Sequence, residues 1–165
     1  VLKCRQRHGN LYNGHQQQGR TMMSLKYKSH DGGKADAGLG TASSADCVIR
    51  SIAIAENQGY RKTKSELNEL LQELTGGLQR SCNNGTPTPV FHRYLTDRGY
   101  ELTLTPNTYL RDHNFQDRTV IAVLPRHNVA IIDNIVLDTW DSRKCRKTKC
   151  GSPKLQGFYE KQSVA

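Results

Sequence analysis

The sequence has no long hydrophobic run, and this absence excludes a helix that crosses a membrane. No segment reaches the roughly 18 consecutive apolar residues that such a helix needs. Residues 1–10 are polar and lack the apolar centre of a secretory signal peptide. We therefore expect a cytoplasmic protein without a membrane partner.

Cysteine is scarce and odd in number, which argues against a disulfide framework. Without a signal peptide, an odd set of cysteines is typical of free thiols in a reducing compartment. The five cysteines are Cys4, Cys47, Cys82, Cys145 and Cys150. Cys145 and Cys150 would need two further ligands to hold zinc, and the histidines near the N-terminus lack cysteine partners at zinc spacing. We therefore expect neither a bound metal nor a cofactor.

A phosphate-binding loop is also missing. Glycines are frequent in residues 32–40, but the Lys-Ser/Thr pair that completes such a loop does not follow them. We interpret this segment as the flexible lip of a cleft beside Cys47.

The formal charge of +9 is concentrated at the two ends of the chain. Residues 1–34 and 142–165 each carry seven Lys/Arg and one acidic residue, whereas residues 35–141 carry ten and thirteen. Basic ends of this kind are typical of solvated arms that contact nucleic acid or acidic partners. We therefore expect a flexible basic segment over 1–36, a folded core over 37–141 and a basic tail over 142–165, with weak nucleic-acid contact through the ends.

The hydrophobic pattern predicts helices first and an antiparallel sheet afterwards, which is an α+β fold. The expected helices begin near Asp46, at a Thr63–Glu66 capping box and at Pro87, and they end at Gly59, Gly76 and Gly99. The expected strands cover residues 100–104, 119–124, 128–132 and 135–139, with a further short strand near 22–27.

Cys47 lies at the start of the first expected helix, which Ser44 or Asp46 can cap. The helix dipole and the free N–H groups at this end favour an anion, so the thiol loses its proton more easily. The thiolate is the nucleophilic form of cysteine. The alternative is a cysteine that serves only as a small buried apolar side chain.

His127 and Asp138 are expected to lie on one face of a β-hairpin. A two-residue turn at 133–134 places His127 opposite Trp140 and diagonal to Asp138. A carboxylate beside a histidine fixes its tautomer and stabilises the imidazolium, which is what a general base needs. The alternative is a histidine at the sheet edge that pairs with an aspartate for solubility.

The order of these residues resembles the papain-like cysteine peptidase superfamily, and most closely its small bacterial and bacteriophage members, including C39-like peptidases. In those proteins an Asp-Cys pair precedes a helix, as at Asp46 and Cys47, and a His-Xaa-Val-Ala strand, as at 127–130, leads to an Asp-Xaa-Trp-like end, as at 138–140. The similarity covers about residues 40–141.

The resemblance implies a papain-like fold and an acyl-enzyme on Cys47. Cys47 would be the nucleophile, His127 the base and then the acid, and Asp138 the orienting group. The backbone N–H of Cys47 would face the oxyanion. Many family members place a glutamine shortly before the cysteine as a second donor, whereas Thr41 stands at that position here. Ser43, Ser44 or a residue from elsewhere would have to replace it, which leaves an amidase or a transferase open.

Two functions are therefore carried forward. The first is a peptidase or isopeptidase that cleaves a protein or peptide, and the resemblance implies that it acts in a bacterial cytoplasm during phage infection. The second is a non-catalytic protein of the same fold that binds nucleic acid or a host protein through its basic ends.

Overall fold

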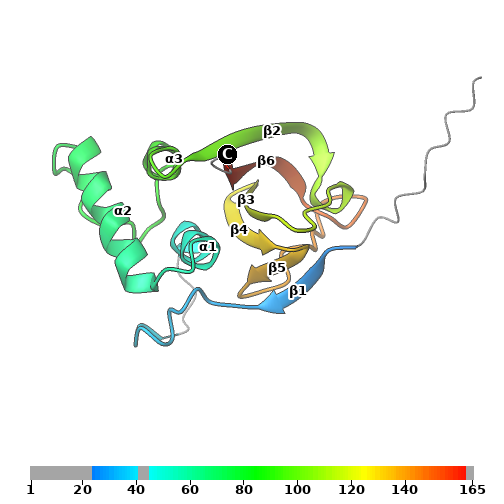
Figure 1. The fold of residues 1–165 in the computed structure, drawn as a ribbon, viewed down its shortest axis with the longest axis horizontal. Helices are drawn as coiled ribbons and strands as arrows, with labels where there is room; N and C mark the ends of the chain where they lie inside the picture. The colour runs from blue at the N-terminus through cyan, green and yellow to red at the C-terminus, as the bar shows by residue number, and fades with distance from the viewer. Residues whose placement is uncertain (1–23, 41–44, 163–165) are drawn as a thin grey trace, which may run out of the picture.

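The computed structural model describes residues 24–40 and 45–162, and within them it has three α-helices, one short 3-10 helix and six strands (Figure 1). The helices are α1 (Cys47–Ala55), α2 (Tyr60–Leu74), α3 (Thr88–Thr96) and the 3-10 helix η1 (Leu110–Asp112). The strands are β1 (Lys26–Ser29), β2 (Tyr100–Tyr109), β3 (Thr119–Leu124), β4 (His127–Ile132), β5 (Ile135–Asp138) and β6 (Lys154–Lys161). The expected α+β class is confirmed.

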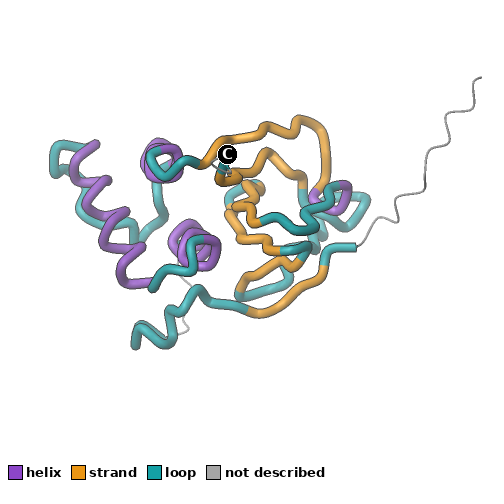
Figure 2. Tube along the Cα trace, viewed as in Figure 1, coloured by secondary structure: helices purple, strands orange, loops and turns teal. Residues whose placement is uncertain are grey.

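The six strands form one sheet in the order β1-β5-β4-β3-β6-β2. All neighbours are antiparallel except β1, which runs parallel to β5 at one edge. The three α-helices gather on one side of the molecule, and the strands curl around the other, where η1 also lies (Figure 2). α1 packs between α2 and the central strand β4.

Side chains alternate between the two faces of the sheet and so contribute to two hydrophobic clusters. Ile121 of β3 and Tyr159 of β6 pack with the helices, whereas their neighbours Val120 and Phe158 face the inside of the curled sheet, where Phe115 lies. Strands β3 and β6 therefore contribute to both hydrophobic clusters, and α1 packs against the buried face that they share with the helices.

Strand β6 corrects the prediction of a solvated tail over 142–165. It lies between β3 and β2 and is hydrogen-bonded to both. Its apolar residues Leu155, Phe158 and Tyr159 are buried. The prediction was wrong because the basic run before this strand dominates the composition of the region and hides a short apolar strand behind it.

The N-terminal boundary is also different from the prediction of a flexible segment over 1–36. The described part begins at residue 24, and β1 pairs with β5 from Lys26 to Ser29. Leu25 and Lys34 are both buried. These residues belong to the folded body because β1 completes the sheet edge beside β5. Within the described part of the strand expected near 22–27, the strand begins only at Lys26; residues 22 and 23 lie outside the described residues.

The start of α2 differs from its prediction as well. α2 begins at Tyr60 with Gly59 as its N-cap. Thr63 donates its hydroxyl to the Gly59 carbonyl, and Glu66 accepts a hydrogen bond of 2.6 Å from the Tyr94 hydroxyl on α3. The capping box predicted from Thr63 and Glu66 does not form, because the helix already begins at Tyr60 and the Thr63 backbone N–H donates to the Gly59 carbonyl.

The hairpin of β4 and β5 has the expected register. Ala130 faces Leu137 and Ile131 faces Val136 across the pair. The turn residues 133–134 both have positive φ angles, 49° and 60°, as the tightest hairpin turns require. The predicted register is therefore confirmed, and it places His127, at the start of β4, near Asp138, at the end of β5.

In the described residues, no helix has both the length and the apolar character needed to cross a membrane.

Candidate active site

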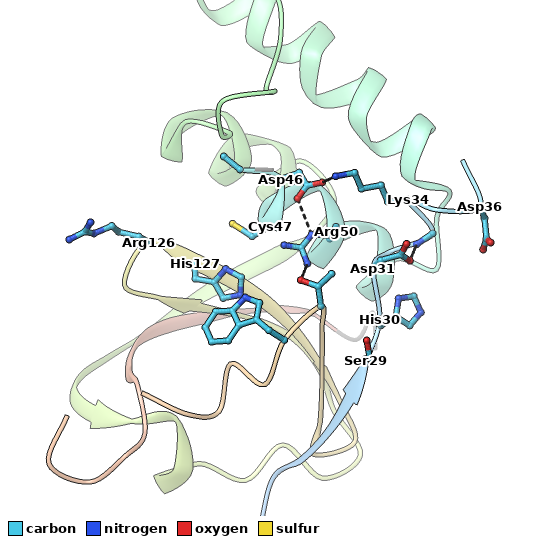
Figure 3. Close-up of a pocket in the computed structure, with 14 residues that line it drawn as sticks. Ser29, His30, Asp31, Lys34, Asp36, Asp46, Cys47, Arg50, Arg126 and His127 are labelled. Carbon is cyan, nitrogen blue, oxygen red and sulfur yellow. Dashed lines mark hydrogen bonds and ion pairs between the residues drawn. The ribbon is translucent and has the colours of Figure 1, made fainter. Parts of the chain in front are cut away.

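Three elements bring the predicted residues to one end of the sheet. Cys47 is the first residue of α1, His127 is the first residue of β4, and Asp138 is the last residue of β5. The thiol of Cys47 and the ring of His127 face the same cleft, which has a volume of about 880 Å³ (Figure 3). The structure therefore assembles all three residues that the sequence singled out.

The imidazole of His127 is held on Asp138. Its Nε2 lies 2.5 Å from Oδ2 of Asp138, whose side chain is almost completely buried. The Thr139 backbone N–H donates to the other carboxylate oxygen at 2.7 Å. The ring of Trp140 lies 5.2 Å from the His127 ring, centroid to centroid, and is half-exposed. The carboxylate and the indole together restrict the orientation of the imidazole.

The thiol of Cys47 has its pKa lowered from the ordinary value. Burial raises this pKa, but hydrogen bonds from His127 and from the backbone N–H of Asn128, with the charges of His127 and Arg50, lower it by more. Since Nε2 of His127 is occupied by Asp138, Nδ1 is the ring nitrogen that remains for the sulfur. The site therefore favours the thiolate.

The pKa of His127 is shifted in the opposite direction, upwards. Burial lowers its pKa, but the hydrogen bonds to Asp138 and Cys47 and the charges of both raise it to about 9. Burial raises the pKa of Asp138, and its contacts with His127 and with the Thr139 backbone bring it below the ordinary value. The three shifts act together: they favour a thiolate on Cys47, an imidazolium on His127 and a carboxylate on Asp138.

The start of α1 is built differently from the prediction. Asp46 occupies the N-cap position, but within the described residues its side chain makes no cap hydrogen bond. Its carboxylate instead accepts hydrogen bonds from Arg50 Nε at 3.0 Å and from the Tyr60 hydroxyl at 2.7 Å, and it pairs with Lys34 Nζ at 3.0 Å. Ser44, the other predicted cap, lies outside the described residues.

The buried cluster behind Cys47 was not predicted from the sequence. Lys34, Asp46 and Arg50 are each less than a tenth exposed. The i, i+4 spacing of Asp46 and Arg50 on one helix was a signal that could have been used. The contribution of Lys34 depends on the path of a loop, which no local pattern encodes.

The glycine-rich segment lines the cleft, but contacts tie it to the site. His30 donates its backbone N–H to the Asp138 carbonyl at 2.9 Å, and Arg61 donates to the Ala37 carbonyl. Gly32, with φ of +70°, lies so close to α1 that an added Cβ would sit 2.9 Å from Cα of Arg50. The described part of this segment is therefore a fixed wall of the cleft rather than a loose lip.

The other sequence candidates lie outside this site or outside the described residues. Cys82 is completely buried, and burial raises the pKa of its thiol. Cys145 and Cys150 are partly buried free thiols. Thr41, Ser43 and Ser44, considered for the second oxyanion donor, lie outside the described residues.

Comparisons with known proteins add no relative: no family model, no curated protein and no solved structure matches this chain. The function must therefore be argued from the geometry and charge of the cleft.

Proposed function

We propose that this protein is a cysteine-dependent amide-bond hydrolase of the papain-like type, acting as a peptidase or isopeptidase. One observation carries the proposal: the thiol of Cys47 and the imidazole of His127 line the same open cleft, and the carboxylate of Asp138 is hydrogen-bonded to that imidazole. The opposite pKa shifts of Cys47 and His127 support it further, since activated nucleophiles and their bases have such shifts.

The first half of the reaction forms a thioester. The thiolate of Cys47 attacks the carbonyl carbon of the amide, a C–S bond forms, and the carbonyl oxygen takes up the negative charge. The imidazolium of His127 gives its proton to the amide nitrogen as the C–N bond breaks and the amine leaves. Asp138 stabilises the imidazolium before this transfer and holds the ring afterwards.

The second half restores the enzyme. His127 removes a proton from a water molecule, which attacks the thioester carbon as the C–S bond breaks. The carboxylic acid product leaves, and Cys47 is again a thiolate beside an imidazolium. The backbone N–H of Cys47 belongs to the first turn of α1, where N–H groups have no partner within the helix, so it is suited to face the oxyanion.

A non-catalytic binding protein of the same fold receives less support. That alternative relies on the basic ends of the chain, and part of the C-terminal end is the internal strand β6. It also gives no reason for a low-pKa thiol in an open cleft.

Selective alkylation tests the proposal. We expect iodoacetamide to modify Cys47 faster than Cys145 and Cys150 at about pH 6.5, because only the thiolate reacts. Cys145 and Cys150 are the informative comparison since, like Cys47, they are partly exposed. Peptide mass spectrometry over a time course gives the three rates, and equal rates would remove the main support for an activated nucleophile.

A substrate screen then separates the two functions. Fluorogenic peptide amides and isopeptide-linked peptides are the probes, and Cys47→Ser is the matched variant. Hydrolysis by the wild type that the variant lacks, with the same thermal unfolding profile, supports the enzyme. A binding function that persists unchanged in Cys47→Ser would favour the alternative.

A further inference from the structure

Arg50 is a buried cation one helical turn after Cys47, and the reaction described above gives it no role. Its Nε donates to Asp46 at 3.0 Å, and one terminal nitrogen donates to Oδ1 of Asp138 at 3.0 Å and to the Thr139 hydroxyl at 2.8 Å. Figure 3 shows the guanidinium of Arg50 beside Cys47, with a dashed line to Asp46.

We propose that Arg50 is a positioning residue, which joins the helix that carries the nucleophile to the strand that carries Asp138 and balances the buried charge around Cys47. The inference deepens the proposed function and rests on it. Arg50 acts on the reacting groups through Asp138 and Asp46 rather than by touching the substrate.

Arg50 helps to hold the carboxylate of Asp138 in one orientation. Oδ2 of Asp138 accepts from His127, and its Oδ1 accepts from Arg50 and from the Thr139 backbone. Because both oxygens are occupied from fixed directions, the carboxylate is held with Oδ2 on the imidazole. Arg50 and Asp138 are 88 residues apart in the chain, so this contact also fixes α1 relative to β5.

Arg50 also offsets negative charge beside Cys47. Asp46 precedes Cys47 directly, and a buried carboxylate at that place opposes formation of the thiolate. Arg50 and Lys34 both pair with Asp46 and offset its charge. Burial raises the pKa of Cys47, and the charge of Arg50 is among the influences that lower it.

The charged and titratable groups around the cleft come from every element packed against it. They are Arg50 from α1 and Asp46 at its N-cap, His30 and Asp31 directly after β1, Lys34 and Asp36 from the glycine-rich segment, Tyr60 from α2, Arg126 and His127 at the start of β4, and Asp138 from β5. Removal of Arg50 leaves Asp46 and Asp138 with one cation fewer, and the thiolate of Cys47 becomes less favourable.

A purely structural ion pair is the competing explanation, because buried ion pairs often serve packing and contribute little net stability. Such a pair changes the free energy of unfolding when it is broken, but it does not move the pH dependence of Cys47. The pH profile of Cys47 alkylation therefore distinguishes the two roles.

The experiment measures the rate of iodoacetamide alkylation at Cys47 against pH in Arg50→Gln, Arg50→Lys and Asp46→Asn. In Arg50→Gln we expect the acid limb of the profile to move up by about one pH unit. Arg50→Lys keeps the charge but cannot make all the contacts, so a smaller upward move is expected. Asp46→Asn removes the opposing charge, and its limb moves to lower pH.

Arg118→Gln is the matched control. Arg118 makes two hydrogen bonds to Glu160 on the same sheet, and it does not line the cleft. Its loss lowers stability and leaves the alkylation profile of Cys47 in place.

The outcomes separate the inference from the proposed function. If wild-type Cys47 reacts no faster than Cys145 and Cys150, the proposed function and this inference both fail. If wild-type Cys47 is fast and folded Arg50→Gln keeps the wild-type profile, only the role of Arg50 is refuted. Should Arg50→Gln not fold, the other two variants decide. The role of Arg50 is refuted if the acid limb of Arg50→Lys does not move to higher pH and that of Asp46→Asn does not move to lower pH.

Discussion

Cys47 and Cys82 lie against the same hydrophobic cluster, yet their thiols have opposite properties. Burial raises the pKa of Cys82, and a side-chain hydrogen bond with Thr86 does not offset this effect; the thiol also donates to the Leu67 carbonyl at 3.9 Å. Cys47 is also largely withdrawn from water, but the imidazole of His127 and a backbone N–H reverse the effect of burial. The difference shows that the partner of a buried thiol, rather than its burial, decides the direction in which its pKa shifts.

Removal of each thiol in turn should give the largest difference between the two cysteines. Cys47→Ser should lower hydrolysis by about 10³-fold or more, because no other nucleophile replaces the thiolate. Cys82→Ser should keep the activity of its folded fraction. Assays with any peptide amide that the wild type cleaves measure both variants, and equal losses in the two would contradict the assignment of Cys47 as nucleophile.

Loss of the imidazole should make Cys47 resemble Cys82. In His127→Gln the cation beside the sulfur is gone, and alkylation of Cys47 at about pH 6.5 should slow by roughly tenfold or more. His113→Gln is the control, because His113 contacts Thr108 and Phe115 away from the cleft. A Cys47 that stays fast in His127→Gln would mean that the helix start alone activates it.

The pH dependence of the free energy of unfolding tests the raised pKa of His127, the group that distinguishes Cys47 from Cys82. The pKa of His127 is raised to about 9, partly by Asp138. A raised pKa stabilises the folded state below the unfolded value of about 6.5, and this contribution disappears as the pH rises. In Cys47→Ala the free energy of unfolding should therefore fall by about 1 kcal/mol per pH unit from about pH 6.5 up to the folded-state pKa of His127, which lies lower than in the wild type because Cys47 no longer contributes to it.

The matched variant is Cys47→Ala combined with Asp138→Asn. Here the imidazole has lost its charged partner, and the stability should stay level over the same range. Chemical denaturation at a series of pH values measures both proteins. Parallel curves would show that Asp138 does not raise the pKa of His127.

The smallest effect is expected from truncation of Cys82. Cys82→Ala should lower the free energy of unfolding by about 1–2 kcal/mol, because it leaves a small cavity beside Leu67. Urea unfolding at neutral pH measures the change. An unchanged stability would mean that the core closes around the smaller side chain.

The His127–Asp138 pair could be predicted from sequence because it depends on local rules. Strand side chains alternate, and a two-residue turn at 133–134 fixes which positions face each other. The start of α1 at Cys47 followed from the spacing of Val48, Ile49 and Ile52, which are all buried.

The rest of the site depends on contacts between distant segments. The bond between Arg50 and Asp138 requires the docking of α1 against β5, and the pair of Lys34 with Asp46 requires the path of the glycine-rich segment. Strand β6 was missed because its basic surroundings masked its apolar residues. Composition over a window of the chain does not show which few residues will be buried.

The place of β6 also sets the order in which this protein can mature on the ribosome. β2 and β3 are hydrogen-bonded to β6 rather than to each other, so they stay apart until the last strand has been synthesised. Cys47, His127 and Asp138 all emerge earlier than that strand. We therefore expect a nascent chain to hold Cys47, His127 and Asp138 before it has the closed sheet that fixes their positions, and the site to form only once β6 has been added.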